Sequence, residues 1–306
     1  MQKQKSDARF MALALSLGRR GMGRVWPNPA VGCVIVRDGV IVGRGRTADG
    51  GRPHAETEAL CQAGDKARGA TAYVSLEPCS HHGKTPPCAN ALIDAGIAEV
   101  VVATGDPNPQ VSGAGIAMLE AAGIAVRMGI LKEQADADHA GFFLTQTRGR
   151  PYITLKLATT LDGHIATTTG DSQWITGPQA RRLVHAMRAR HDAVMVGAGT
   201  VRADDPELTC RLPGLRDRSP QPFVMSRHGN LPPTSHLAWR ELPRINLSGC
   251  TIVQQQMRGT GKRWAHTPFW PKPKVATLIY PTRWANSQAR ASRGFSAKAA
   301  GNWLRH

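Results

Sequence analysis

Two short stretches, His54-Ala-Glu56 and Glu77-Pro-Cys-Ser-His-His-Gly-Lys-Thr-Pro-Pro-Cys88, decide the fold of the first half of this chain. They offer one imidazole and two thiols, which suits a catalytic zinc site with three protein ligands and a fourth position for water. Bound zinc lowers the pKa of that water from about 15.7 toward about 7. Glu56, two residues from His54, is placed to carry the proton. The pattern therefore predicts a hydrolytic zinc site with His54, Cys79 and Cys88 as ligands.

The spacing is typical of zinc deaminases that act on nucleobases, whose pattern is H-x-E followed by P-C-x-x-C. This chain departs from it in one place, because eight residues separate Cys79 from Cys88 where the common pattern has two. The alternative is that these are ordinary buried or loop residues, since a free cysteine often packs as a small apolar side chain. Residue type, order and spacing together favour the zinc interpretation.

Length and composition are those of an ordinary globular protein. The 306 residues are enough for two domains of usual size. No run of eighteen apolar residues is present and residues 2–7 are polar, so we expect a cytoplasmic protein without a signal peptide. Six cysteines are too few and too unevenly spaced for a disulfide scaffold. We expect the four outside the zinc pattern to be structural thiols: Cys33, Cys61, Cys210 and Cys250.

The net charge of +17 suggests nucleic-acid binding as one hypothesis, so its distribution matters. Residues 242–306 contain eleven of the 39 Lys and Arg and none of the 22 Asp and Glu, which leaves an excess of only six positive charges on the rest. The body of the protein is therefore ordinary in charge. The basicity belongs to the C-terminal stretch.

Apolar periodicity predicts alternating helices and strands. Residues 7–20 have helical spacing, with Ser6 or Asp7 as N-cap, and Asp38-Gly39 is typical of a hairpin turn between strands at 31–36 and 40–42. A layered α/β domain with helices on both faces of its sheet follows. Its other expected elements are helices at 54–63, 88–95, 115–122 and 133–143, and strands at 72–76, 99–104 and 124–128. The second half, also of α/β type as far as about Ala238, is expected to have strands at 151–157 and 193–197, a helix at 177–190 and further structure at 200–205. After Ala238 sustained periodicity is hard to find, apart from a short strand candidate at 275–280.

Further motifs surround the zinc pattern: Pro27-Asn-Pro29 before it, and Leu161-Asp-Gly163, Ser172-Gln-Trp-Ile-Thr176 and Gly199-Thr-Val-Arg-Ala-Asp-Asp-Pro206 after it. With the long inter-cysteine loop, they resemble the bifunctional deaminase/reductase family of bacterial riboflavin biosynthesis. The resemblance runs from the N-terminus to about Ala238. It implies a cytidine-deaminase-like three-layer domain at 1–146, followed by a partial dihydrofolate-reductase-like α/β domain at 147–238.

For the first domain, the resemblance implies hydrolysis of the 2-amino group of 2,5-diamino-6-(5-phosphoribosylamino)pyrimidin-4-one. Zn²⁺ would be the cofactor and Glu56 the catalytic proton carrier. Asn28, His81 and Lys84 would bind the substrate. The charge of Lys84 suits a phosphate-bearing molecule, although a solvated loop lysine is nearly as good an interpretation. His81 and His82 are equally consistent with surface residues.

For the second domain, the resemblance implies reduction of the ribosyl side chain to ribityl by NADPH. The chain has no G-x-G-x-x-G fingerprint, so motifs of that kind alone indicate no nicotinamide site. Structural alternatives carry about equal weight for each implied residue, such as core packing for Trp174 and a helix cap for Thr200. The implied cofactor contacts are Ala158, Trp174, Thr200 and Asp204, and the implied substrate contacts are Ser172, Arg188, Leu208 and Arg211.

Past Ala238 the family continues with alternating strands and helices and a Glu-Gly-Gly turn, which this chain lacks. Five of its seven tryptophans lie there instead. We therefore expect residues 239–306 to be a basic, non-homologous tail, frame-shifted or disordered, and the reductase to be impaired. The competing interpretation is a nucleic-acid-binding arm, since interleaved aromatic and cationic side chains stack bases and neutralise phosphates.

The leading hypothesis is a zinc-dependent pyrimidine deaminase with an attached NADPH-dependent reductase domain. Its expected partner is a small phosphorylated pyrimidine, without membrane or nucleic acid, and a homo-oligomer is left open. The alternative is a deaminase of tRNA or another nucleic acid that uses the basic tail to bind RNA. The eight-residue loop and the weak charge of the body argue against it. A non-catalytic remnant is the third hypothesis.

Overall fold

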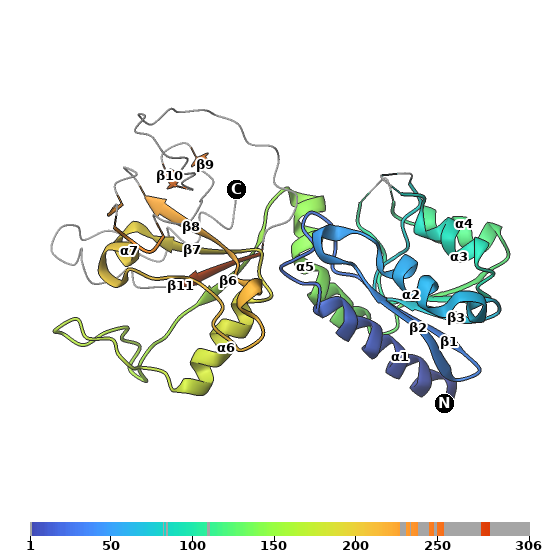
Figure 1. Ribbon diagram of the computed structural model, residues 1–306, viewed down its shortest axis with the longest axis horizontal. Helices are drawn as coiled ribbons and strands as arrows, with labels where there is room; N and C mark the ends of the chain where they lie inside the picture. Colours follow the sequence, from blue (N-terminus) through green and yellow to red (C-terminus); the bar gives the residue numbers. More distant parts are fainter. Residues whose placement is uncertain are drawn as a thin grey trace.

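The computed structural model describes residues 2–81, 83, 85–108, 111–226, 231–232, 234–237, 245–247, 250–253 and 277–281. Within them the chain forms two α/β units, each built on one sheet, and α5 (Lys132–Arg148) leads from the first unit to the second (Figure 1). The predicted α/β class is confirmed. Lys84, His82, Ala238 and most of the stretch after it lie outside the described residues.

The first sheet has five strands in the order β2-β1-β3-β4-β5. β1 and β2 form the predicted hairpin, in which Asp38 and Gly39 have φ values of 50° and 77°, as a two-residue hairpin turn requires. β1 pairs antiparallel with β3, while β3, β4 and β5 are parallel. The strands are β1 (Gly32–Arg37), β2 (Val40–Arg46), β3 (Thr71–Val74), β4 (Glu99–Val102) and β5 (Ala125–Met128).

Helices cover both faces of this sheet, as predicted. Alternate residues of β1 point to opposite faces: Ile35 packs in the core under α2, α3 and α4, and Val34 packs in the core under α1 and α5. No helix among the described residues combines the length and the apolar character that crossing a bilayer requires. The helices are α1 (Gln2–Arg19), α2 (Ala55–Ala63), α3 (Cys88–Asp94) and α4 (Ala114–Ala121), with short 3-10 turns η1 (Asp49–Gly51) and η2 (Gly64–Ala67).

The first helix begins earlier than predicted, and Asp7 does not cap it. α1 starts at Gln2, and Asp7 lies inside it with 1% of its surface exposed. Its carboxylate accepts a hydrogen bond from the Tyr73 hydroxyl at 2.7 Å and pairs with the Arg127 guanidinium at 2.7 Å. The capping interpretation is therefore wrong, because Asp7 lies within the helix and its carboxylate binds partners from β3 and β5. These partners make burial of the charge tolerable.

A close backbone contact holds α2 against the hairpin. A Cβ at Gly45 of β2 would lie 2.0 Å from the carbonyl oxygen of Ala55, and one at Gly43 would lie 2.2 Å from that of Ala59. Both alanines are fully buried. The helix backbone therefore rests on the strand, and this contact fixes where α2 begins.

The second sheet has the order β6-β11-β7-β8-β10-β9. Its first four strands are parallel neighbours, and β8, β10 and β9 pair antiparallel. The short strand candidate at 275–280 corresponds to β11, although it was not expected to belong to the second sheet, and β8, β9 and β10 were not predicted. The elements are β6 (Tyr152–Lys156), α6 (Pro178–Arg188), β7 (Ala193–Gly197), α7 (Ala198–Asp204), η3 (Arg216–Arg218), β8 (Gln221–Ser226), β9 (Ile245–Leu247), β10 (Cys250–Val253) and β11 (Thr277–Pro281).

We expect Gly45→Ala to lower the free energy of unfolding by about 1–3 kcal/mol, the usual cost of overpacking a core. The added methyl group has no space between β2 and α2 unless the helix shifts. Urea denaturation measures the change. Gly105→Ala is the matched control, because the nearest atoms to a Cβ there lie 3.6 Å and 3.7 Å away. Equal stability of the two variants would contradict the close packing.

Candidate metal and catalytic site

Two helix starts and one loop bring the predicted metal ligands together. His54 is the N-cap residue of α2, Cys88 is the first residue of α3, and Cys79 lies in the loop that follows β3. Both helices therefore direct their N-terminal ends, which carry partial positive charge, toward the ligands. Such an environment favours ionised sulfur.

The three donor atoms lie within 4.8 Å of one another. Nδ1 of His54 is 3.2 Å from Sγ of Cys88 and 3.7 Å from Sγ of Cys79. Tetrahedral zinc with bonds of about 2.0–2.3 Å places its ligand atoms roughly 3.6 Å apart. The nitrogen and the two sulfurs therefore fit this ion by donor type and by spacing.

The two thiols differ in how firmly they hold a proton. A hydrogen bond from the Cys88 thiol is the main cause that lowers the pKa of Cys79 to about 4, and the same bond, together with burial, raises the pKa of Cys88. The backbone N–H of Cys88 also donates to the sulfur of Cys79, at 3.3 Å. Because zinc needs both sulfurs ionised, metal binding to this set releases a proton.

Glu56 lies in the first turn of α2 with 3% of its surface exposed. Burial, followed by the negative charge of Cys79, raises the pKa of its carboxyl to about 7. A carboxyl with such a pKa can take up and release a proton near neutral pH. Glu56 stands beside the donor cluster without belonging to it, as a proton carrier should.

The structure brings one of the three predicted substrate-binding residues to the metal ligands. Nδ2 of Asn28 donates to the backbone oxygen of Gly51 at 2.6 Å and lies 3.3 Å from Nε2 of His54. His81 is exposed in the loop between the cysteines, and Lys84 lies outside the described residues. The substrate contacts of all three residues stay predictions.

A buried carboxylate that no functional prediction included organises the cysteine loop. Glu77, with 4% of its surface exposed, accepts hydrogen bonds of 3.1–3.3 Å from three backbone N–H groups, two in the loop after β4 (Asp106 and Gly113) and one in the first turn of α4 (Gly115). A Cβ at Gly115 would lie 2.0 Å from the carbonyl oxygen of Pro78. The loop after β4 is thereby tied to the residues just before Cys79. The signal in the sequence is the Glu-Pro-Cys motif itself.

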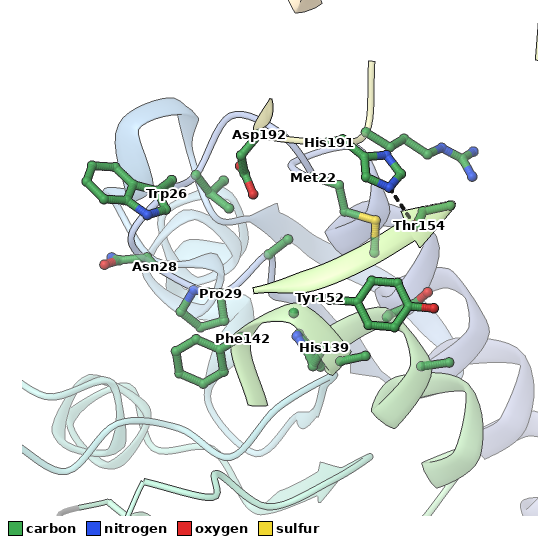
Figure 2. A pocket seen from close by; sticks show the side chains of 18 residues that line it. Met22, Trp26, Asn28, Pro29, His139, Phe142, Tyr152, Thr154, His191 and Asp192 are labelled. Atoms are coloured by element: carbon green, nitrogen blue, oxygen red, sulfur yellow. Dashed lines mark hydrogen bonds between the residues drawn. The ribbon is translucent and has the colours of Figure 1, made fainter. Parts of the chain in front are cut away.

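A cavity of about 230 Å³ lies between the two α/β units (Figure 2). Trp26 and Asn28 from the first unit and Tyr152 and Asp192 from the second contribute to its lining. The metal ligands do not line it, so the cavity is not the metal site. Asn28 lines the cavity and also contacts the metal ligand His54.

Cationic side chains gather in the second unit, where β6 and α6 end. Burial and the charge of Arg188 lower the pKa of Lys156, and burial and the charge of Arg211 lower the pKa of Arg188. Nη1 of Arg188 donates to the backbone oxygen of Thr209 at 2.9 Å, while Nε is buried without a hydrogen-bond partner among the described residues. These features indicate a place with an excess of positive charge, in which Glu207 lies 3.5 Å from Nη1 of Arg211. Lys156, which the sequence-based predictions did not include, lies here with Arg188 and Arg211. Its place in the run Leu155-Lys-Leu157 is the signal that could have indicated it.

The other residues predicted for the second domain lie in two segments. Trp174 stands in the long connection between β6 and α6 that extends away from the sheet in Figure 1. The residue is 69% exposed, and the centroid of its ring lies 4.1 Å from Cζ of Arg181, so the core-packing alternative is wrong. Contacts of all these residues with cofactor or substrate stay predictions. Ala158 and Ser172 share that connection, Thr200 and Asp204 lie in α7, and Leu208 follows α7.

Replacement of either thiol should empty the metal site. We expect Cys79→Ser and Cys88→Ser to hold less than about one tenth of the zinc of the parent chain, because three protein donors are what such a site has. Mass-spectrometric metal analysis per mole of folded chain measures this. Cys61→Ser is the control, because its thiol is exposed in α2, away from the donor cluster. Full zinc content in both site variants would exclude this ligand set.

Two families match the two halves of the chain. Residues 4–104 match the family described as the cytidine and deoxycytidylate deaminase zinc-binding region, and residues 151–260 match the family described as the RibD C-terminal domain. The first range contains all three metal ligands, and the second contains the cationic cluster.

Curated relatives and solved structures match across both halves. The riboflavin biosynthesis protein RibD of Escherichia coli (strain K12) is 53% identical over 213 residues, which are 70% of this chain and 58% of the relative. That of Aquifex aeolicus (strain VF5) is 53% identical over 67% of this chain and 58% of its own length. The chain thus spans 58% of the length of these two relatives.

Among solved structures, form 1 of Acinetobacter baumannii RibD is 38% identical with a TM-score of 0.75, and the match covers 90% of this chain and 80% of that one. A Thermotoga maritima structure is 47% identical with a TM-score of 0.68, and covers 72% of this chain and 63% of that one. The fold, the ligand set and these matches together place this chain in the RibD family.

Proposed function

We propose that the first α/β unit catalyses zinc-dependent hydrolytic deamination of 2,5-diamino-6-(5-phosphoribosylamino)pyrimidin-4-one in riboflavin biosynthesis. One observation carries the proposal: His54, Cys79 and Cys88 form a single donor cluster beside the buried Glu56. The Thermotoga maritima relative supports it, since that protein is described as a diaminohydroxyphosphoribosylaminopyrimidine deaminase and 5-amino-6-(5-phosphoribosylamino)uracil reductase.

The side chains divide the chemistry between them. Zinc, when bound, supplies a water of lowered pKa. Glu56 holds a proton in one half of the reaction and delivers it to the leaving amine in the other, which its pKa of about 7 allows. Asn28, whose amide touches the ring of His54, would hydrogen-bond the polar edge of the pyrimidine. His81 and Lys84 would contact the rest of the substrate.

We also propose that the second unit binds NADPH and reduces the ribosyl side chain of the deaminated product to ribityl. The cluster of Lys156, Arg188 and Arg211 supports this, because it is suited to the phosphate that the product carries. Family membership supports the remaining assignments. These are Ala158, Trp174, Thr200 and Asp204 toward the cofactor, and Ser172 and Leu208 toward the substrate.

The extent of the second domain is part of the proposal. We place the domain boundaries at 1–146, 147–238 and 239–306 and propose that the last stretch is frame-shifted, so that reduction is impaired, although the match to the RibD C-terminal domain extends to residue 260. An alternative frame of the encoding DNA that carries acidic residues and a Glu-Gly-Gly turn would support this. If no such frame exists, the frameshift proposal is wrong. A cytoplasmic location is proposed with the same function.

We expect Glu56→Gln to release ammonia about 10²–10⁴-fold more slowly than the parent, which is the usual contribution of general acid-base catalysis. The amide keeps the shape of the side chain and cannot carry the proton, so zinc content should not change. A coupled glutamate dehydrogenase assay measures the rate. Glu58→Gln, an exposed position on the same helix, should keep the parent rate. Undiminished release by Glu56→Gln would refute the proton role.

For the second unit, we expect Arg188→Met to bind the deaminated pyrimidine phosphate about 10–100-fold more weakly, since hydrogen bonds to a charged partner are lost. The same change should raise the melting temperature of the ligand-free chain, because it removes a guanidinium whose buried Nε has no hydrogen-bond partner among the described residues. Calorimetry measures both. Arg202→Met, at an exposed position on α7, is the control. Unchanged affinity and melting temperature would exclude an anion site at Arg188.

A further inference from the structure

Arg52 is a cation at the edge of the metal site. It directly precedes Pro53 and the ligand His54, and its side chain is half-buried. Nη1 donates to Oγ1 of Thr85 at 2.6 Å. A Cβ placed on Gly83 would come within 3.2 Å of Nη2. The guanidinium therefore lies against the loop that joins the two cysteine ligands.

The charge of Arg52 has no counter-ion in the described part of the chain, where Thr85 is the hydrogen-bond partner of its side chain. Other arginines of the first unit are paired, for example Arg19 with Asp138 and Arg127 with Asp7. A guanidinium has five N–H donors in a planar fork. One bond to Thr85 orients the group and leaves donors for an anion, and phosphate matches that fork with two oxygens at once.

Thr85 completes the arrangement. Its oxygen accepts the hydrogen bond from Arg52, so its own hydrogen is left to donate to an anion. Arg52 stands two residues before the ligand His54, and Thr85 stands three residues before the ligand Cys88. Both side chains therefore come from segments that lead directly into metal ligands, and we infer that the phosphorylated arm of a substrate bound at the metal extends toward them.

We propose that Arg52 and Thr85 form the subsite for the phosphate of the deaminase substrate. Arg52 is then a specificity-determining residue, which selects phosphorylated over unphosphorylated pyrimidines and takes no part in the chemical step. This inference rests on the proposed deamination for the identity of the substrate.

The direct test is calorimetric titration of the zinc-loaded full chain with ribose 5-phosphate. Every variant carries Arg188→Met, so that the cationic cluster of the second unit does not contribute. We expect Arg52→Gln to weaken binding about tenfold or more, and Thr85→Val to weaken it about threefold, in line with charged and neutral hydrogen bonds. Arg68→Gln is the matched control, because Arg68 is exposed just before β3, whereas Cys79 follows that strand. Equal binding by the Arg52 and Arg68 variants would overturn the proposal.

Arg52 could act by recognising the phosphate or by holding the loop between the cysteines in place. The rates of ammonia release from the substrate and from its dephosphorylated form distinguish these two roles. For Arg52→Gln we expect KM of the phosphorylated substrate to rise about tenfold with kcat little changed, and the dephosphorylated substrate to be unaffected. A parallel loss with both substrates, together with loss of zinc, would mean that Arg52 only holds the loop, and would overturn the proposal. If the parent releases no ammonia while ribose 5-phosphate binding depends on Arg52, the proposed deamination fails and the phosphate subsite stands.

Discussion

The backbone contact between α2 and the β1–β2 hairpin is the constraint on which the metal site depends. Gly43 and Gly45 carry no Cβ, and the residues of α2 that face them are alanines, so the helix sits directly on the strand. A larger residue on either side would displace the start of α2. His54 occupies the N-cap position at that start, and Glu56 lies in the first turn of the helix. The imidazole ligand and the proton carrier are therefore placed together by a single packing contact.

Polar contacts fix the cysteine side of the site. A buried carboxylate costs free energy unless donors surround it, and Glu77 accepts hydrogen bonds from three backbone N–H groups in the loop after β4 and the first turn of α4. Two residues later Cys79 receives the N–H of Cys88. Burial raises the pKa of Glu56, whose carboxyl lies among the metal ligands His54, Cys79 and Cys88. Apolar packing thus places the proton carrier and one ligand, and directional hydrogen bonds place the other two ligands.

The parts of this arrangement that could be predicted are those with local and chemically specific signals. The Asp38-Gly39 turn needs positive φ at both residues, and the His-x-Glu and Pro-Cys patterns need few other residues to be recognised. Interactions between distant residues that belong to no recognisable motif could not be predicted. In the sequence Asp7 has the features of a helix cap, whereas in the structure it accepts a hydrogen bond from Tyr73, which is 66 residues away. The hydrogen bond from Arg52 to Thr85 joins residues 33 positions apart. Such pairs exist only once the sheet has formed.

X-ray absorption at the zinc edge, on the full chain purified with one equivalent of zinc, tests the central claim most directly. A catalytic site built by His54, Cys79 and Cys88 predicts two sulfur neighbours at about 2.3 Å and two nitrogen or oxygen neighbours at about 2.0–2.1 Å, one from the imidazole and one from water. Four sulfur neighbours, or a metal without sulfur, would contradict the account.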